Sequence, residues 1–217
     1  MKVAGNYIAD GYAHVSGIIS PDIANAILSE IKIDTAPGSI PLSQEDVFSP
    51  VLKRAAFEVY GPHYTPMKFL LWALTPVMED ITGVALAPSY NYFRVYRGGD
   101  VCHIHSDRPA CEHSMTLTLA YSDGANWPFC VGRQLLDEGK PGPITDTFGD
   151  EPHATISMDP GDAVIYRGMA LRHGRPQPNP NCWSAHMFLH WVAREGRHIA
   201  HAFEGRVSRE PLAFSFA

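Results

Sequence analysis

Apolar residues recur at helical spacing in the first third of the chain. Ser20 and Pro21 are typical of an N-cap and of a first helical turn. A short strand is predicted before them, over residues 13–19, and a loop rich in Pro, Ser and Gly is predicted over residues 36–50. The helix between these segments is predicted to be amphipathic, because three isoleucines follow one another at four-residue spacing: Ile23, Ile27 and Ile31.

A second helical segment follows this loop. Residues 66–82 predict a long helix that Pro76 kinks and that Gly83 caps at its C-terminal end. Residues 51–60, which precede it, predict a short helix or a turn. The helical part of the chain, about residues 20–83, is therefore expected to support a sheet from one side.

From residue 90 onward the pattern is that of strands. In residues 114–121, Thr116 and Thr118 alternate with apolar neighbours, which predicts a half-buried strand. Four more segments predict strands: 90–96, 154–158, 163–166 and 183–192. Turns or irregular loops are predicted where Gly and Pro gather: 98–99, 159–162 and 176–180. Helices followed by many short strands predict a mainly β chain with supporting helices, folded as a β-sandwich or jelly roll.

Length and composition fit one such domain over residues 1–217, with its jelly-roll core at about residues 90–195. Hydrophobic residues make up 45% of the chain and charged residues 18%, so the chain can bury a core. A net charge of −6 and a pI near 6.0 argue against a broad surface for nucleic acid or membranes.

The cellular environment is predicted from two absences. No run of about 18 apolar residues is present, and the N-terminal residues lack the apolar core of a signal peptide, so a cytoplasmic protein is expected. The cysteines form no C-x-x-C pair, which argues against a structural zinc and favours reduced thiols: Cys102, Cys111, Cys130 and Cys182.

Two potential metal ligands lie two residues apart in the strand-rich part of the chain. His105 and Asp107 would point to the same side of an extended segment, so that an imidazole and a carboxylate could converge on one ion. His173, which follows the predicted strand 163–166, is the third candidate. Two histidines and one carboxylate leave half of an ion's coordination sphere open, as in non-haem iron(II) oxygenases. His103 has the same facing parity as His105 and is an alternative ligand.

The order and spacing of three motifs resemble the 2-oxoglutarate- and iron(II)-dependent dioxygenases, in particular their prolyl 4-hydroxylase-like branch. The motifs are Tyr-x-x-Gly at 96–99, His-x-Asp at 105–107, and a Gly-Asp-Ala segment at 161–163 that precedes His173-Gly174. Residues 13–31 also resemble the opening strand, Ser-Pro and helix of that branch. The resemblance covers about residues 13–192 and implies a double-stranded β-helix, a distorted jelly roll.

The resemblance implies a site and a chemistry. It implies that His105, Asp107 and His173 hold Fe(II), and that 2-oxoglutarate and O2 are consumed with succinate and CO2 as co-products. Tyr96 matches a tyrosine that lines the site and reaches 2-oxoglutarate, although a core aromatic is the alternative. Because family halogenases lack the metal carboxylate, the presence of Asp107 implies hydroxylation rather than halogenation.

One expected cation is missing from its usual place. The family usually carries an Arg or Lys about ten residues after the distal histidine, to bind the far carboxylate of 2-oxoglutarate, but residues 181–184 contain no basic side chain. A dianion in a partly buried pocket needs a charged partner. Arg175 is the first candidate and Arg108 the second, each with a surface or ion-pair role as its alternative. The remaining candidates are Ser184, His186, Arg167 and Arg94.

Three other features allow more than one interpretation. Arg108 and Glu112 could form an ion pair over the iron or contact substrate. Residues 126–152, rich in Gly, Pro and acids, could form a lid or an ordinary hairpin excursion. The tryptophans could line an apolar pocket or belong to the core: Trp127, Trp183 and Trp191.

The sequence thus predicts an Fe(II)- and 2-oxoglutarate-dependent oxygenase that acts on a small molecule or a peptidyl residue, with no nucleic-acid or membrane partner. One alternative is a jelly-roll protein that binds a metal without oxidising anything, or a cupin-type metalloenzyme that does not use 2-oxoglutarate. Another is an inactive relative that binds a peptide through the aromatic strand 90–96.

Overall fold

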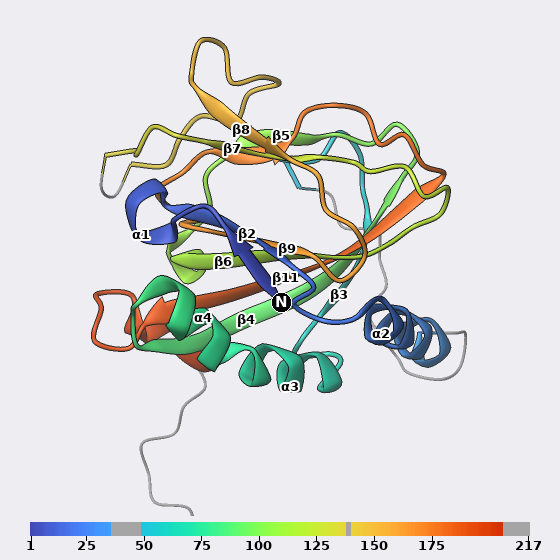
Figure 1. Cartoon of the computed structure of the whole chain (residues 1–217), viewed down its shortest axis with the longest axis horizontal. Helices are drawn as coiled ribbons and strands as arrows, with labels where there is room; N and C mark the ends of the chain where they lie inside the picture. Colours follow the sequence, from blue (N-terminus) through green and yellow to red (C-terminus); the bar gives the residue numbers. More distant parts are fainter. Residues whose placement is uncertain (36–48, 138–139, 206–217) are drawn as a thin grey trace, which may run out of the picture.

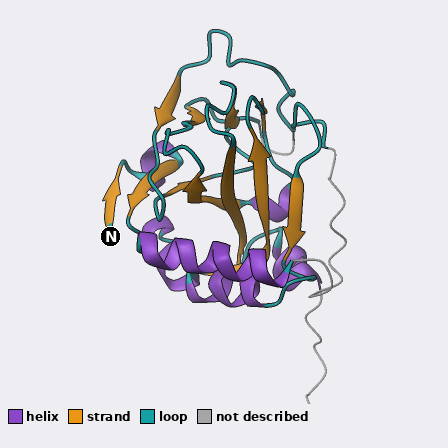
Figure 2. Ribbon diagram, turned by 90° about the vertical axis from the view of Figure 1, so that its right-hand side faces the viewer, coloured by secondary structure: helices purple, strands orange, loops and turns teal. Residues whose placement is uncertain are grey.

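The fold consists of two antiparallel sheets that face each other, with helices on the outer side of the larger one (Figures 1 and 2). The computed structural model describes residues 1–35, 49–137 and 140–205. Helices therefore form one layer, the larger sheet the middle layer and the smaller sheet the third. This arrangement confirms the prediction of a mainly β fold with helical support, a jelly roll.

The larger sheet has seven strands in the order β1-β2-β9-β6-β11-β4-β3. Their bounds are Lys2–Ala4 (β1), Tyr12–Ser16 (β2), Ala163–Tyr166 (β9), His113–Tyr121 (β6), Trp183–Ala193 (β11), Leu86–Arg97 (β4) and Phe57–Tyr60 (β3). The smaller sheet has four strands in the order β5-β10-β7-β8. Their bounds are Cys102–His105 (β5), His173–Arg175 (β10), Phe129–Gly132 (β7) and His153–Ile156 (β8).

The helices begin and end where their sequence signals indicate. The helix α2 spans Pro21–Asp34, and the Ser20 hydroxyl accepts a hydrogen bond from the backbone N–H of Ile23 at 3.3 Å. Gly83, with φ of 69°, ends the helix α4 in the left-handed conformation. The other helices are α1 (Tyr7–Asp10), α3 (Pro66–Ala73), α4 (Thr75–Thr82) and the short η1 (Pro109–Cys111) and η2 (Ile199–Gly205).

Several local predictions were wrong. Residues 57–60 form the edge strand β3 rather than a helix or turn, because they pair with residues 92–95 of β4. The predicted helix over 66–82 is broken into α3 and α4 at Leu74, where Pro76 starts a new helix instead of kinking one. Ile23 is 51% exposed, so only Ile27 and Ile31 of the predicted isoleucine face pack on the sheet.

Two predicted loops have different outcomes. Residues 126–152 contain the strand β7, which pairs antiparallel with the next strand, β8, and also with β10, so the hairpin interpretation of this segment fits the structure. Most of the predicted loop 36–50 lies outside the described residues.

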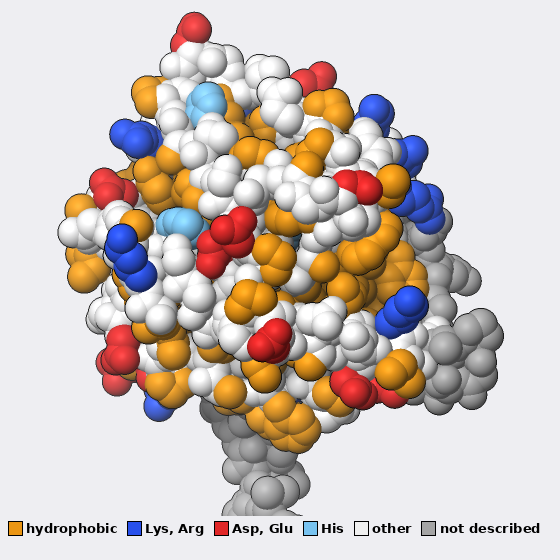
Figure 3. All heavy atoms as spheres, turned by 45° about the vertical axis from the view of Figure 1, so that its right-hand side comes forward, with side chains coloured by type: hydrophobic (Ala, Val, Ile, Leu, Met, Phe, Trp, Pro, Cys, Tyr) orange, Lys and Arg blue, Asp and Glu red, His pale blue; other side chains and the backbone are white. Residues whose placement is uncertain are grey.

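In the described part of the chain, no helix is both long enough and apolar enough to span a bilayer. The face shown in Figure 3 carries acidic and basic side chains scattered among uncharged ones.

The larger sheet presents two different faces to its two neighbours. The face toward the helices is apolar, with Phe93, Met115, Leu117, Met187 and Trp191 in one hydrophobic cluster. The face toward the smaller sheet carries the alternate residues of the same strands: Arg94, Tyr96, Thr116, Thr118, His186 and His190. Because the smaller sheet covers this second face, the strand over 114–121 is buried on both sides and not half-buried as predicted.

Candidate metal centre

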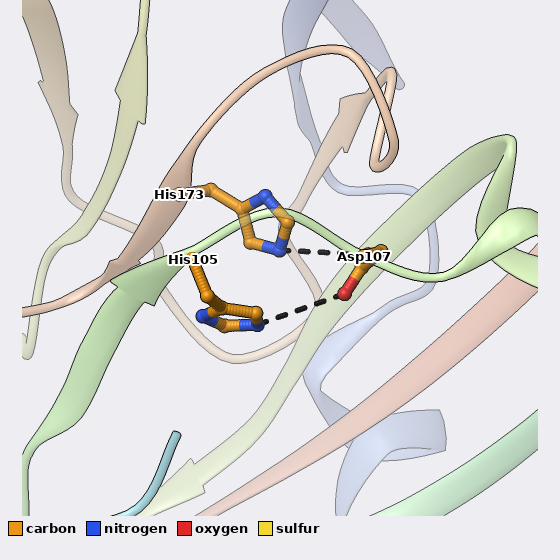
Figure 4. Close-up of side chains that lie close together, drawn as sticks. All are labelled: His105, Asp107 and His173. Atoms are coloured by element: carbon orange, nitrogen blue, oxygen red, sulfur yellow. Dashed lines mark ion pairs between the residues drawn. The ribbon is translucent and has the colours of Figure 1, made fainter. Parts of the chain in front are cut away.

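Three predicted ligands converge between the two sheets. His105 ends β5 and His173 begins β10, and the two residues are direct partners in the antiparallel pairing of these strands. Asp107 lies in the turn after β5, where its carboxylate faces both imidazoles (Figure 4). Its oxygens lie 3.6 Å from Nε2 of His105 and 3.5 Å from Nε2 of His173. The ligand atoms of all three residues lie within 4.8 Å of one another.

The backbone orients both imidazoles. Nδ1 of His105 lies 2.7 Å from the carbonyl oxygen of His103, and Nδ1 of His173 lies 2.9 Å from that of Leu171. A carbonyl oxygen only accepts, so each Nδ1 carries the proton and each Nε2 directs a lone pair toward Asp107. This orientation of a histidine by its second nitrogen is the usual support of a metal ligand.

The electrostatic setting favours the forms of Asp107 and His105 that bind a cation. Burial alone would raise the pKa of Asp107, but the two neighbouring imidazoles outweigh burial and hold it well below its usual value. Burial, helped by the neighbouring His173, lowers the pKa of His105. A carboxylate and a neutral imidazole are the states that coordinate a metal ion.

Comparisons with known proteins agree with this geometry. No family model and no curated protein matches the sequence. Among solved structures, the non-haem α-ketoglutarate-dependent carbocyclase SnoK from nogalamycin biosynthesis matches with a TM-score of 0.67 at 12% identity, over 96% of this chain and 91% of its own. A prolyl-4-hydroxylase from Pseudomonas putida matches with a TM-score of 0.57 at 11% identity, over 85% and 94%.

A third match is HygX from Streptomyces hygroscopicus, solved with nickel and 2-oxoglutarate, with a TM-score of 0.61 at 12% identity over 87% of this chain and 85% of its own. The chain has the fold of the iron- and 2-oxoglutarate-dependent oxygenases. The expected double-stranded β-helix is thereby confirmed.

Within this oxygenase fold, Arg175 lies in the space between the sheets. Its side chain is 1% exposed, and its guanidinium lies over the rings of Trp127 and Phe129, with Cζ at 5.3 Å and 5.1 Å from their centroids. One terminal nitrogen lies 3.4 Å from the Thr116 hydroxyl and 3.3 Å from Nδ1 of His186. No carboxylate of the described residues lies within ion-pair distance of this guanidinium.

Three buried polar atoms in this space have no hydrogen-bond partner in the described part of the chain. Nε of Arg175, Nε2 of His186 and the hydroxyl of Tyr121 are buried without a hydrogen bond from any described residue. The rings of Tyr121 and His186 are 5.8 Å apart. Burial, then the nearby Arg175, holds the pKa of His186 well below its usual value, so this imidazole is neutral. Because buried polar groups are normally paired, this cluster has the character of a site for an anion.

Tyr96 faces the same space but is already engaged. It is 1% exposed, and its hydroxyl accepts a hydrogen bond from Arg94 at 2.8 Å. Its ring packs edge-on against Trp127 and His186. Arg94 in turn pairs with the buried carboxylate of Glu58 at 2.6 Å, which makes Arg94 unsuitable as a free cation for the cosubstrate.

The remaining polar candidates have structural partners. The hydroxyl of Ser184 accepts from the side chain of Asn179 at 3.1 Å and so holds the loop over 176–180. Arg167 donates to the carbonyl of Ile8 at the far side of the larger sheet. Nδ1 of His103 lies 2.9 Å from the carboxylate of Asp146, so His103 is not part of the ligand group.

Arg108 and Glu112 do not form the suggested ion pair. Arg108 is exposed, and its guanidinium lies over the ring of Tyr90, with Cζ at 4.6 Å from the centroid. The carboxylate of Glu112 accepts instead from the backbone N–H of Ala193 at 2.9 Å.

The three tryptophans differ in burial: Trp127 and Trp191 are fully buried, while Trp183 is 38% exposed.

Sequence reasoning missed two residues that position Asp107. The carbonyl of Gly168 accepts from the backbone N–H of Asp107 at 2.9 Å, and a Cβ at Gly168 would lie 2.5 Å from the Asp107 carboxylate. The hydroxyl of Ser114 lies 3.4 Å from the same carboxylate and 2.9 Å from Nδ1 of His190. No local pattern indicates Gly168, and the signal for Ser114 was indirect: its partner His190 has the facing parity of His186 on β11.

Proposed function

We propose that this chain is an Fe(II)- and 2-oxoglutarate-dependent oxygenase, most simply a hydroxylase, whose residues 1–217 act as one domain. The observation that carries the proposal is the pairing of two features in one space between the sheets. An open group of two histidines and one carboxylate faces this space, and so does a fully buried arginine without a carboxylate partner. The first fits a metal ion with vacant positions, and the second fits an anion.

The donor set fits iron(II). Ligand atoms that lie about 2.1 Å from an ion at right angles are about 3 Å apart, close to the separations of 3.5 and 3.6 Å found here. His105, Asp107 and His173 together offer one carboxylate and two imidazole nitrogens. Such a set holds iron(II) on one side only and leaves the other side for cosubstrate and O2.

The pocket beside it fits a 2-oxoglutarate dianion. Arg175 supplies the positive charge that the far carboxylate needs, although it stands two residues after His173 and not about ten. The neutral His186, which receives a hydrogen bond at Nδ1, presents an N–H at Nε2, and Tyr121 presents a hydroxyl. Tyr96 and Thr116 complete the walls.

The chemistry divides between the bound groups and the chain. Iron(II) with 2-oxoglutarate supplies the activation of O2 that inserts oxygen into a C–H bond, with succinate and CO2 released. The chain's own part is to hold the ligands in fixed protonation states, orient the cosubstrate through Arg175, and exclude bulk water with the buried walls Trp127 and Phe129. Asp107 fills the carboxylate position, which favours hydroxylation over halogenation.

The substrate is proposed to be a small molecule or a peptidyl residue. Solved structures of the same fold include a carbocyclase and an epimerase from nogalamycin biosynthesis and a prolyl-4-hydroxylase. Both substrate classes therefore fit the fold.

The test is succinate release from 2-oxoglutarate by the whole protein. We expect succinate to form only with iron(II) and O2 present, and His173→Ala to lower its rate at least about 1,000-fold. His103→Ala, a histidine outside the ligand group, is the matched control and should retain the native rate. If iron binds but calorimetry detects no 2-oxoglutarate binding, the protein is a metal protein of another class and the proposal is wrong.

A further inference from the structure

A cavity of about 300 Å³ opens beside the loop that carries Asp107. It is bounded by Tyr60 and Tyr90 of the larger sheet, by Arg108 and Ala110 of the loop after Asp107, and by His201 of η2. Its volume is at the lower end of the range for small-molecule sites, about 300–1,000 Å³. The residue next to a metal ligand thus lines this cavity.

A row of aromatic rings connects the cavity to the ligand group. The Tyr60 ring stacks on Tyr92 at 5.3 Å, and Tyr90 stacks on His190 at 4.6 Å. The hydroxyl of Tyr90 lies 3.1 Å from Sγ of Cys111, and ligand atoms of Cys111, His190 and Asp107 lie within 4.8 Å of one another. A molecule in the cavity that contacts Tyr90 is therefore separated from the Asp107 carboxylate by about one side chain.

The charges around the cavity leave one cation available. Glu204 is held by Lys68 at 3.2 Å on the rim. Arg108 has no carboxylate of the described residues within ion-pair distance, and the ring of Tyr90 lies against one face of its guanidinium. This contact holds the exposed guanidinium at the cavity, where it can bind an anion through charge-assisted hydrogen bonds.

We propose that this cavity binds the substrate of the oxygenase, and that the substrate is a small carboxylate with an apolar body, whose anionic group pairs with Arg108. The inference rests on the proposed function and names the substrate class of the same site. One arginine balances one negative charge, which fits a carboxylate better than a phosphate dianion. The rings of Tyr60 and Tyr90, with Pro62 and Ala110, form apolar walls for the rest of the molecule.

The test uses two simple probes of equal shape, 3-phenylpropionate and 3-phenylpropionamide. Their binding is measured by calorimetry on the protein loaded with iron(II) and 2-oxoglutarate, without O2. We expect the acid to bind at least about tenfold more tightly than the amide, since a charge-assisted pair replaces a neutral contact. Arg108→Ala should remove this preference, and Arg108→Lys should restore part of it, because lysine keeps the charge but loses the planar fork.

The controls separate this inference from the proposed function. Arg133→Ala removes an exposed positive charge elsewhere and should keep the preference for the acid. The affinity of Arg108→Ala for 2-oxoglutarate should stay within about twofold of native, because that anion is assigned to Arg175. Equal binding of acid and amide by the native protein would overturn the inference while leaving succinate release untouched. So would loss of 2-oxoglutarate binding in Arg108→Ala, or tighter binding of phenyl phosphate than of the acid through Arg108.

Discussion

Two buried arginines, one from each sheet, lie between the two sheets but in opposite electrostatic situations. Arg94 on β4 pairs with Glu58 at 2.6 Å, donates to Tyr96 at 2.8 Å, and its partner Glu58 also accepts from Tyr60. Arg175 on β10 has only weak contacts with a hydroxyl and an imidazole, and its Nε has no partner in the described structure. The chain itself pairs the charge in the first region, whereas in the second region the pairing of the charge is proposed to come from a bound anion.

A buried charge that the chain itself pairs stabilises the fold, whereas a buried charge that the chain leaves unpaired is available to a ligand. Taking a guanidinium out of water is costly unless a counter-charge and hydrogen bonds offset the cost. At Arg94 the chain supplies both, so the network stabilises the native state. At Arg175 the described residues supply no carboxylate and only two long hydrogen bonds, to Thr116 and His186, so the folded protein carries an unfavourable term that an anion would relieve.

The largest expected effect comes from removing each arginine in turn. Arg94→Met should lower the free energy of unfolding by about 3–5 kcal/mol, because it leaves Glu58 buried without its counter-charge. Arg175→Met should leave the metal-free protein as stable as before, or more stable by about 1 kcal/mol, and weaken 2-oxoglutarate binding about 100-fold. Urea unfolding and calorimetry measure the two quantities.

A second substitution checks the reason for the Arg94 effect. Glu58→Leu added to Arg94→Met should recover most of the lost stability, because no unpaired charge then remains. The distinction between the two regions would be refuted if both arginine variants lost stability to the same extent.

The sequence was sufficient to predict which three side chains converge, His105, Asp107 and His173, and insufficient for their surroundings. His105, Asp107 and His173 are found by spacing because strand geometry sends alternate residues to one side and the family order supplies the third. Arg175 was ranked first among the cations for the same reason, its parity with His173. The engagement of Arg94 by Glu58 was out of reach, because it depends on β3 and that segment was predicted as a helix or turn.

Other errors have the same cause, the long-range pairing of short segments. Residues 57–60 and 129–132 are four-residue strands whose conformation is decided by the strands that they join, so local propensity says little. The role of Gly168 depends on the close approach of Asp107 and the carbonyl of Cys111, which no local pattern encodes. The outline of the fold is thus predictable from periodicity, while contacts between distant segments are not.

A buried histidine beside the ligand group, His190, should also make the stability of the fold sensitive to acid. Burial lowers the pKa of His190 to about 4, below its value of about 6.5 in an unfolded chain. Below pH 6.5 the unfolded chain therefore binds a proton that the folded chain refuses, so this contribution is fully present above pH 6.5 and is lost as pH falls toward 4. For the metal-free protein we expect a loss of about 2 kcal/mol from this residue by pH 5.

The measurement is urea unfolding at pH 7 and pH 5 for the native protein and for His190→Gln, which keeps a partner for Ser114 but does not titrate. The variant should lose less stability between the two pH values. The same loss in both proteins would mean that His190 is not the source.

The smallest effect is expected from a substitution at Gly168, which lies beside the carboxylate of Asp107. A Cβ there would lie 2.5 Å from the Asp107 carboxylate and 2.5 Å from the backbone carbonyl of Cys111, so in Gly168→Ala the new methyl group must move apart from both. The carbonyl belongs to η1 and moves less easily than a side chain, so the carboxylate should turn away from the imidazoles. We expect iron(II) affinity to fall about tenfold, about 1.4 kcal/mol, with the unfolding free energy of the metal-free protein changed by less than that. Gly149→Ala, where a Cβ meets nothing within 4 Å, is the control for metal affinity, which it should not alter. If Gly168→Ala binds iron as tightly as the native protein, the position of Asp107 is not set by this contact, and the ligand group is more adaptable than its hydrogen bonds indicate.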